Sequence, residues 1–191
     1  MVYIFWWAFD PPHLGHFAII EAVLKHLHPE KIIIIPSGKR NDKAYKVDDY
    51  HRRNMLELFL SEIQDDRIFC DFHFFSIDSE MITRDVDMYA QKVYGNSLIH
   101  IFWSDTLSGM VDWDIEWYAA QKIHKLFIPR YGYEMPSLDE TIRNASFLPG
   151  VSIPNISSTL VRSQIRSSNY SGIFTSIKEY IVENQLYTDW H

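Results

Sequence analysis

Two histidines near the N-terminus are the residues best placed to do chemistry. A short apolar segment, residues 2–6, predicts a buried strand and leads directly into the run Phe9–His16. His13 and His16 are three residues apart, so they share one face at the start of a helix predicted over 13–28. Unpaired N–H groups and the macrodipole at a helix N-terminus favour an anion. Two imidazole donors at this place therefore predict binding of a phosphate chain.

A hydroxyl-rich run, Ile156–Arg162, opens a second predicted helix over 158–167. Ser158 and Thr159 can cap this helix or bind a phosphate. Arg162 lies one turn later and offers a forked pair of donors to phosphate oxygens. On its own, the run would indicate a capped helix with a surface arginine. Together with the two histidines, it favours a second phosphate-binding element.

The segments that must position these motifs alternate between strand and helix patterns. Strands are predicted over residues 2–6, 32–35, 68–75, 99–103, 126–128 and 147–153, and helices over 13–28, 49–63, 83–94, 158–167 and 173–184. Such alternation is typical of an α/β fold with a parallel sheet and helices on both faces. Ligands of open α/β sheets bind at the carboxyl ends of the strands. No repeat or linker divides the sequence, so we predict a single domain over residues 1–191.

Composition limits the classes of function. The chain carries 18 Lys and Arg against 25 Asp and Glu, a formal net charge of -7, which argues against a nucleic-acid-binding protein. No run approaches the roughly 18 apolar residues of a membrane span, and no signal-peptide pattern begins the sequence. The single cysteine, Cys70, is expected to be a buried structural residue, which fits a reducing compartment such as the cytoplasm.

The His-x-Gly-His run after a strand and the Ile-Ser-Ser-Thr-x-Val-Arg run together resemble the nucleotidyltransferase superfamily, which transfers AMP or CMP from a nucleoside triphosphate. Further segments, in the same order along nearly the whole chain, resemble one branch, the nicotinate-nucleotide adenylyltransferases. These segments are Pro36–Gly38 with Lys43 and the helix from His51, Ser104-Asp105 with Trp113 downstream, Pro129–Gly132, and the closing residues 179–187.

This resemblance implies a Rossmann-like nucleotidyltransferase fold and an enzyme that binds ATP and nicotinate mononucleotide together. The phosphate of the mononucleotide would attack the α-phosphorus of ATP in line, releasing pyrophosphate and giving deamido-NAD. Positioning and charge neutralisation carry such a reaction. Mg²⁺ would accompany ATP and bridge phosphate oxygens mostly through water, since the sequence shows no carboxylate cluster for a dedicated metal site. A homo-oligomer is compatible with the sequence, whereas nucleic-acid and membrane partners are not expected.

The resemblance also implies roles for individual residues. His13, His16 and Arg162 are expected to be catalytic, holding the ATP phosphates and stabilising charge on the transferring group. The residues expected to bind ATP are Phe9, Asp10, Ser158, Thr159 and Asp105, with Trp6, Trp7 and Trp103 at further positions of the same motifs. Those expected to bind the acceptor are Lys43, Thr83, Trp113 and Arg130, with Trp113 stacking on the pyridine ring.

Three positions depart from the family pattern in the same way. Where the family has Gly-Gly before x-Phe-Asp-Pro and Gly before x-Asp, this chain has Trp6, Trp7 and Trp103. Glycine there lets the backbone approach a nucleotide closely, and a tryptophan adds a large side chain. We hypothesise one common cause, a genetic code in which UGA specifies glycine. Peptide mass mapping of the native protein tests this hypothesis, because tryptophan at all three positions would exclude it. The alternative is a protein with three genuine tryptophans that binds a different nucleotide, or binds without turnover.

The acceptor is less sharply defined than the nucleotide. The family's Ser-Tyr-Thr pattern is not recognisable in Met81–Arg84, so nicotinate and nicotinamide mononucleotide both stay open, with Thr83 in the segment that recognises the carboxylate. Pantetheine-phosphate adenylyltransferases and cytidylyltransferases are sister alternatives. The Pro129-Arg130 pair and the closing Leu186-Tyr187 favour the nicotinate branch.

Overall fold

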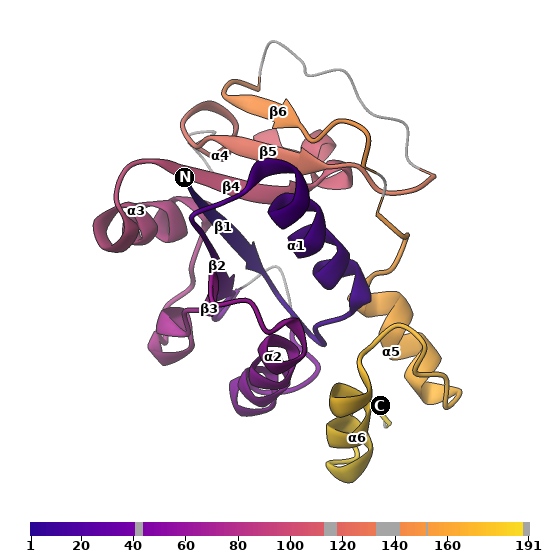
Figure 1. Cartoon of the computed structure of the whole chain (residues 1–191). Coiled ribbons are helices and arrows are strands. Elements are labelled where there is room, and N and C mark those ends of the chain that lie inside the picture. The colour runs from indigo at the N-terminus through magenta and orange to yellow at the C-terminus, as the bar shows by residue number, and fades with distance from the viewer. Residues whose placement is uncertain (41–43, 113–117, 133–141, 152, 189–191) are drawn as a thin grey trace.

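The computed structural model describes residues 1–40, 44–112, 118–132, 142–151 and 153–188. Its centre is a six-stranded parallel sheet in the order β3-β2-β1-β4-β5-β6. The strands are β1 (Val2–Trp7), β2 (Lys31–Pro36), β3 (Ile68–Cys70), β4 (Leu98–Trp103), β5 (Lys125–Ile128) and β6 (Ala145–Phe147). This doubly wound order confirms the predicted Rossmann-like α/β fold. Strands β1 and β4 lie side by side where the winding direction changes (Figure 1).

Helices cover both faces of this sheet (Figure 1). One face carries α1 (Leu14–Leu27), α2 (Asp49–Ile63), α5 (Ser158–Arg166) and α6 (Thr175–Glu183). The other face carries α3 (Thr83–Tyr94) and α4 (Tyr118–Gln121). Two 3₁₀ segments, η1 (His73–Ser76) and η2 (Ser104–Asp112), follow β3 and β4. Within the described ranges, no helix is both long enough and apolar enough to span a membrane.

Strand β1 is apolar along its whole length because its side chains alternate between two cores. Tyr3 and Phe5 pack in the core beneath α1 and α2, whereas Ile4 and Trp6 pack in the core beneath α3. Trp7 is partly buried at the end of the strand and touches both the core beneath α1 and the core beneath α4, but the alternation of the strand places it on the same side as Tyr3 and Phe5. The two neighbouring tryptophans therefore point to opposite faces of the sheet.

The third strand is shorter than the sequence predicts. The run 68–75 forms a strand only as far as Cys70. The Asp71 carboxylate then accepts a hydrogen bond from the main-chain N–H of His73 at 3.0 Å, and the chain turns into η1. This local side-chain contact competes with the sheet ladder and ends the strand.

The last strand also ends earlier than predicted. The run 147–153 contributes only its first residue to β6, which is Ala145–Phe147. Gly150 adopts a positive φ of 70°, and Ile153 keeps one isolated parallel bridge to Arg130. The short α4 and the 3₁₀ segments were not predicted, and the remaining strands and helices agree with the prediction to within one or two residues.

Candidate active site

A cleft opens at the carboxyl ends of β1, β4 and β5, against the N-terminus of α5. Its volume is about 220 Å³. Its lining combines both predicted motifs with the ends of the strands: Trp7, His13, Trp103, Asp105, Arg130, Ser157, Ser158, Thr159 and Arg162. Open α/β sheets bind ligands at such a place, between strands whose connections run in opposite directions. The fold thus brings together two motifs that lie near opposite ends of the sequence.

The two histidines cap α1 together. Nδ1 of His13 accepts a hydrogen bond from the Gly15 main-chain N–H at 3.1 Å, and Nδ1 of His16 accepts one from the His13 main-chain N–H at 3.1 Å. The two rings stack with their centroids 3.7 Å apart. Gly15 is needed because a Cβ there would lie 2.9 Å from the His13 ring and 3.1 Å from the Ile156 carbonyl oxygen. The His-x-Gly-His spacing therefore builds a capping box from two imidazoles.

His13 is a neutral hydrogen-bond donor in this arrangement. Burial first, and then the positive charges of Arg130 and Arg162, lower the pKa of His13 to about 3. Because its Nδ1 atom accepts the Gly15 N–H, the one ring proton lies on Nε2. The side chain lines the cleft, so it can donate to a phosphate oxygen at neutral pH without gaining or losing a proton.

The main-chain N–H groups at the start of α1 are already bonded, contrary to the sequence prediction that they are free for an anion. Leu14 donates to the Gly172 carbonyl at 2.9 Å, and Gly15 donates to the His13 ring. His16 and Phe17 both donate to the carbonyl of the same His13, at 2.9 and 3.3 Å. An anion near α1 would meet the imidazoles and the macrodipole rather than the main chain.

The N-terminus of α5 is the more open of the two. The Ser157 hydroxyl accepts a hydrogen bond from the Leu160 N–H at 3.2 Å and caps the helix. In the part of the chain that the structure describes, no group accepts a hydrogen bond from the main-chain N–H of Ser158 or Thr159. These two donors border the cleft and suit an anionic group.

Direct contacts join the second motif to the first. Arg162 donates to the Asp10 carbonyl at 2.6 Å and to the Thr159 hydroxyl at 3.1 Å. The Ser158 hydroxyl donates to the Pro11 carbonyl at 3.1 Å. One guanidinium therefore fixes the loop after β1, and its remaining donors are left for the cleft.

Arg130 brings a second guanidinium to the same cleft from the end of β5. It donates to the Asp105 carboxylate at 2.9 Å and lies over the Trp103 ring at 4.0 Å. Its Nε atom and Oδ1 of Asp105 are buried and lack a hydrogen-bond partner among the described residues. Buried polar atoms without partners are uncommon, so this pair is well suited to a polar ligand.

Trp7 and Trp103 form walls of the cleft, whereas Trp6 lies outside it. Trp103 is fully buried on the α1 face of β4, and Trp6 packs with the core beneath α3. The indole N–H groups of Trp6 and Trp103 are buried without an acceptor in the described part of the chain. A buried indole normally finds an acceptor, so these two positions accommodate tryptophan poorly.

Phe9 and Asp10 shape the loop between β1 and α1 and do not line the cleft. Phe9 is fully buried with φ at 51°, a left-handed conformation that costs roughly 1–2 kcal/mol for a non-glycine residue. Its ring packs on His16 with centroids 4.7 Å apart. Both oxygens of the Asp10 carboxylate are engaged, by the Lys46 N–H at 2.8 Å and the Tyr187 hydroxyl at 2.8 Å.

The structure describes two of the four residues expected to bind the acceptor, Thr83 and Arg130. Thr83 is buried at the start of α3, on the sheet face opposite α1, and is not among the cleft residues. Arg130 lines the cleft beside His13 and Arg162. Lys43 and Trp113 lie outside the described residues.

Sequence reasoning used the segments that contain Arg52 and Tyr187 but assigned no role to these two buried polar residues, which support the site. Arg52 donates to main-chain carbonyls at the ends of β1 and β2, and Tyr187 donates to Asp10 from the C-terminal region. Burial, and then the adjacent Asp10 carboxylate, raise the pKa of the Tyr187 hydroxyl, so it stays a donor. Cys70 is far from such a role, because burial raises the pKa of its thiol. Its side chain packs against the core beneath α1 and α2 but is only partly buried, less than predicted.

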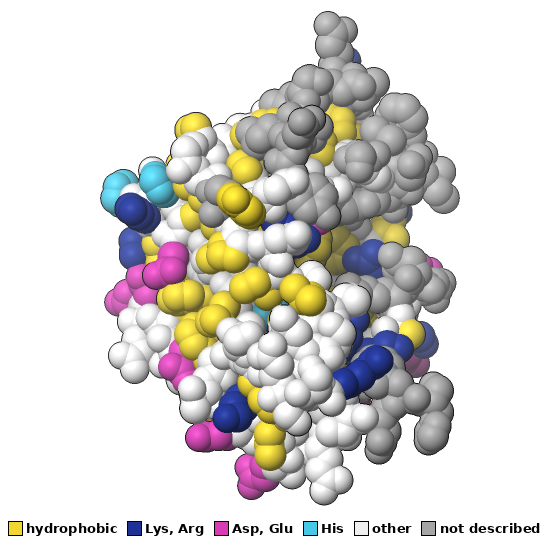
Figure 2. Space-filling model, turned by 90° about the vertical axis from the view of Figure 1, so that its right-hand side faces the viewer, with side chains coloured by type: hydrophobic (Ala, Val, Ile, Leu, Met, Phe, Trp, Pro, Cys, Tyr) yellow, Lys and Arg dark blue, Asp and Glu magenta, His cyan; other side chains and the backbone are white. Residues whose placement is uncertain are grey.

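The charges of the chain are unevenly distributed. On the face shown in Figure 2, Asp and Glu side chains lie mostly on the left, whereas Lys and Arg side chains lie on both halves of the surface. Among the described residues, no group of three or more His, Cys, Asp or Glu is arranged to hold a metal ion. The cleft therefore offers cations and neutral donors to an anion rather than a cage to a metal.

Three relatives extend over nearly the whole chain, and each is named as a probable nicotinate-nucleotide adenylyltransferase. The relative from Caldicellulosiruptor bescii is 27% identical and covers 97% of this chain and 98% of its own length. That from Thermoanaerobacter sp. is 28% identical, covering 94% and 90%. That from Dehalococcoides mccartyi is 29% identical, covering 94% and 93%.

Solved structures and a family pattern agree with these relatives. The nicotinic acid mononucleotide adenylyltransferase of Plasmodium falciparum, complexed with NaAD, superposes with a TM-score of 0.82 at 20% identity, covering 97% of this chain and 96% of that one. A putative nicotinate-nucleotide adenylyltransferase from Vibrio parahaemolyticus superposes with a TM-score of 0.71 at 14% identity, covering 99% and 96%. The cytidylyltransferase-like family pattern matches residues 4–164, and the chain belongs to this family of nucleotidyltransferases.

Proposed function

We propose that this protein, acting as a single domain, transfers AMP from ATP to nicotinate mononucleotide, giving deamido-NAD and pyrophosphate. A phosphate oxygen of the mononucleotide forms a new bond to the α-phosphorus of ATP, and the bond from that phosphorus to the β-phosphate oxygen breaks. The observation that carries the proposal is the cleft in which His13, Arg130 and Arg162 converge at the junction of β1 and β4. The names of the relatives and the NaAD complex of the Plasmodium falciparum protein support this choice of acceptor.

The cleft residues supply what such a transfer needs. Charge builds up on the phosphoryl oxygens, and preorganised donors stabilise it. His13 donates from Nε2 in its neutral form, and His16 holds the His13 main chain through Nδ1. Arg162 and Arg130 add two positive charges, and the main-chain N–H groups of Ser158 and Thr159 complete a triphosphate cradle. Asp105 is placed to accept a hydrogen bond from a ribose hydroxyl or a base through Oδ1, which has no hydrogen-bond partner in the described part of the chain.

Magnesium enters this proposal as part of the substrate MgATP. The carboxylate in the cleft, Asp105, is engaged by Arg130, and the described residues offer no cluster of three ligands. A cation that remains mostly hydrated and bridges phosphate oxygens fits this donor set. The chain's own residues then bind and orient the phosphates.

A nucleotide-binding protein without turnover is the second candidate. The cleft, at about 220 Å³, is smaller than the roughly 300–1,000 Å³ of typical ligand sites, and two indoles form part of its walls. If Trp7 and Trp103 are genuine, they restrict the space available to a nucleoside triphosphate. If the protein is such a binding protein, nucleotide binds to it without release of pyrophosphate.

The test is pyrophosphate release from MgATP with nicotinate mononucleotide, nicotinamide mononucleotide or phosphopantetheine as acceptor. The chain with its tryptophans is compared with the triple variant Trp6→Gly, Trp7→Gly and Trp103→Gly. A His13→Ala version of each protein serves as the control for contaminating activity. We expect release with nicotinate mononucleotide that depends on His13. Pyrophosphate release with only a different acceptor would show that this acceptor, and not nicotinate mononucleotide, is the substrate. Nucleotide binding without pyrophosphate release from either protein would favour the second candidate.

A further inference from the structure

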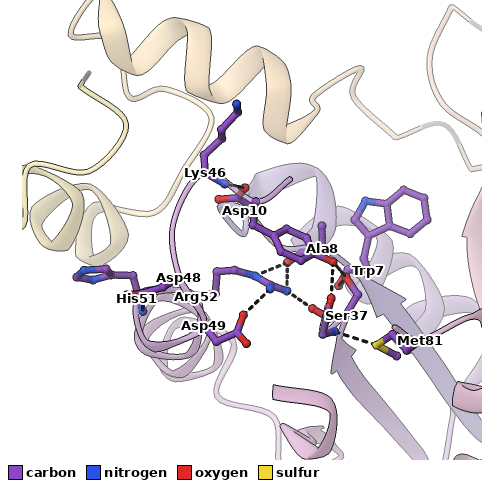
Figure 3. Close-up of polar contacts among 12 residues, drawn as sticks. Trp7, Ala8, Asp10, Ser37, Lys46, Asp48, Asp49, His51, Arg52 and Met81 are labelled. Atoms are coloured by element: carbon purple, nitrogen blue, oxygen red, sulfur yellow. Dashed lines mark hydrogen bonds and ion pairs between the residues drawn. The ribbon is translucent and has the colours of Figure 1, made fainter. Parts of the chain in front are cut away.

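Arg52 is a fully buried arginine in α2 that is not among the residues lining the cleft, and it points toward the ends of β1 and β2 (Figure 3). Its Nε and Nη2 atoms both donate to the Ala8 carbonyl, at 3.1 and 2.8 Å. Nη2 also donates to the Ser37 carbonyl at 2.6 Å, and Nη1 donates to the Asp49 carboxylate at 2.9 Å. One planar group thus holds the chain segments that leave β1 and β2.

The geometry of this contact requires a guanidinium. Two nitrogen atoms of one rigid plane converge on a single carbonyl oxygen, which the point charge of a lysine cannot reproduce. Two rings pack against the group, with Cζ 3.9 Å from the centroid of Tyr45 and 4.7 Å from that of Phe75. The guanidinium therefore has a defined orientation as well as defined partners.

The Ala8 carbonyl is linked to the histidines through two short steps. It immediately precedes Phe9, whose φ of 51° turns the chain away from the direction of β1. The Phe9 ring packs on His16, and Nδ1 of His16 holds the His13 main-chain N–H at 3.1 Å. A rotation of the Ala8 carbonyl would therefore move Phe9, and with it the stacked pair that caps α1.

Arg52 cannot act on a ligand directly. Four of its five N–H donors are used, its side chain is 0% exposed, and it is not among the residues that line the cleft. Its partners are two carbonyls and one carboxylate that is 42% exposed. An ion pair that involves a buried arginine is weak evidence for stability, so stability alone is a poor reason for an arginine here.

We propose that Arg52 is a positioning residue for nucleotidyl transfer, which acts through Ala8 and Phe9 to hold His13 and His16 in their capping geometry. This inference rests on the proposed function for its catalytic consequence. It also couples the histidine pair to the loop after β2, because the same guanidinium holds the Ser37 carbonyl.

The experiment compares Arg52→Lys with Arg53→Lys, its neighbour on the same helix, whose side chain is 51% exposed and 4.0 Å from Glu57. Both are assayed well below their unfolding transitions, in whichever protein, with tryptophans or glycines, releases pyrophosphate. We expect Arg52→Lys to lower kcat by about 10- to 100-fold, with KM for ATP changed by less than about threefold, because the histidines act in the transition state. Arg53→Lys is expected to stay within about twofold of the parent, as surface substitutions usually do.

A second readout is independent of catalysis. In protein labelled with ¹⁵N-histidine, Arg52→Lys should shift the ring nitrogen signals of His13 and His16, and Arg53→Lys should not. If Arg52→Lys does not fold, Asp49→Asn, which removes the charge paired with Nη1, is tested by both readouts. Unchanged kcat, or a loss of kcat and stability with unchanged histidine signals, would overturn the proposal. Absence of activity in the parent protein would refute the proposed function instead, and the histidine signals would still decide the role of Arg52.

Discussion

Replacing the two tryptophans that form walls of the cleft is expected to have opposite effects on protein stability and on nucleotide affinity. The perturbation is the double variant Trp7→Gly, Trp103→Gly, which removes both large side chains that bound the site. We expect the ligand-free protein to become less stable and its response to MgATP to become larger. Both changes follow from one cause, the space that the indoles occupy.

The magnitude can be worked from the burial of Trp103. Truncating a fully buried aromatic residue costs about 3–5 kcal/mol, and removing its unpaired indole N–H returns about 1–3 kcal/mol. The ligand-free variant should therefore lose about 2 kcal/mol of unfolding free energy from this position. With the space open, MgATP at about 100 times its dissociation constant should add about 2.7 kcal/mol. For the chain with tryptophans, the gain at the same MgATP concentration should be smaller by at least about 1.4 kcal/mol, a tenfold weaker affinity.

The assay is urea unfolding followed by circular dichroism, with and without MgATP, alongside calorimetric titration. Trp6→Gly is the matched control, because Trp6 is adjacent to Trp7 in sequence, has a buried indole N–H with no acceptor among the described residues, and packs on the opposite sheet face. It should lose stability without gaining affinity for ATP. The reasoning is refuted if the double variant responds to MgATP no more than the parent, or if Trp6→Gly gains the same response.

Two further predictions concern charge in the cleft. The pKa of His13 is about 3 in the folded protein against about 6.5 when unfolded, so its contribution to stability is complete above pH 6.5 and is lost as the pH falls toward 3, by about 1.4 kcal/mol per pH unit. Urea unfolding across this range should show a flatter dependence for His13→Asn, which keeps a capping side chain; equal slopes would contradict the neutral buried imidazole. Arg162→Lys should lower kcat/KM by about 100-fold, since one ammonium cannot hold Asp10 and Thr159 and still face the cleft. Arg166→Lys, one turn later on α5, is its control, and equal losses in both variants would argue against a specific role for Arg162.

Much of the fold could be predicted because several segments carry strong local signals. The four isoleucines of Ile32–Ile35 predict a buried central strand, and β2 runs from Lys31 to Pro36. The predicted helix over 49–63 has the bounds of α2, since Asp48 caps it through the His51 N–H and supplies a clear start. The strand predicted over 68–75 was wrong beyond Cys70, because a side-chain turn at Asp71 outcompeted a strand-like composition.

Pattern reasoning alone could bring together only those site residues that are close in sequence, whereas the resemblance also predicted Asp105, Arg130 and Arg162, which line the same cleft as His13. The spacing of His13 and His16 placed them together, and their mutual capping is a local contact. Arg52 and Tyr187 reach Ala8 and Asp10 across long stretches of chain, at separations of 44 and 177 residues. Such contacts depend on strand order and helix packing, which no short pattern encodes. The helix from His51 resembles a segment of the family, but its local sequence does not indicate that Arg52 contacts Ala8 and Ser37.

Trp6 and Trp7 show that adjacent positions of one sequence motif can lie in different environments in the structure. Trp6 and Trp7 are adjacent, and both stand where the pattern of the nicotinate-nucleotide adenylyltransferases has glycine. From the sequence alone they therefore count as one departure from that pattern. A strand alternates its side chains with a period of two, and this period sends Trp6 into the core beneath α3 and Trp7 into the cleft. Trp6 should therefore impair core packing, whereas Trp7 should restrict access of the ligand to the cleft. A shared origin in a misread codon would explain why both are present, but the structure assigns each its own physical consequence.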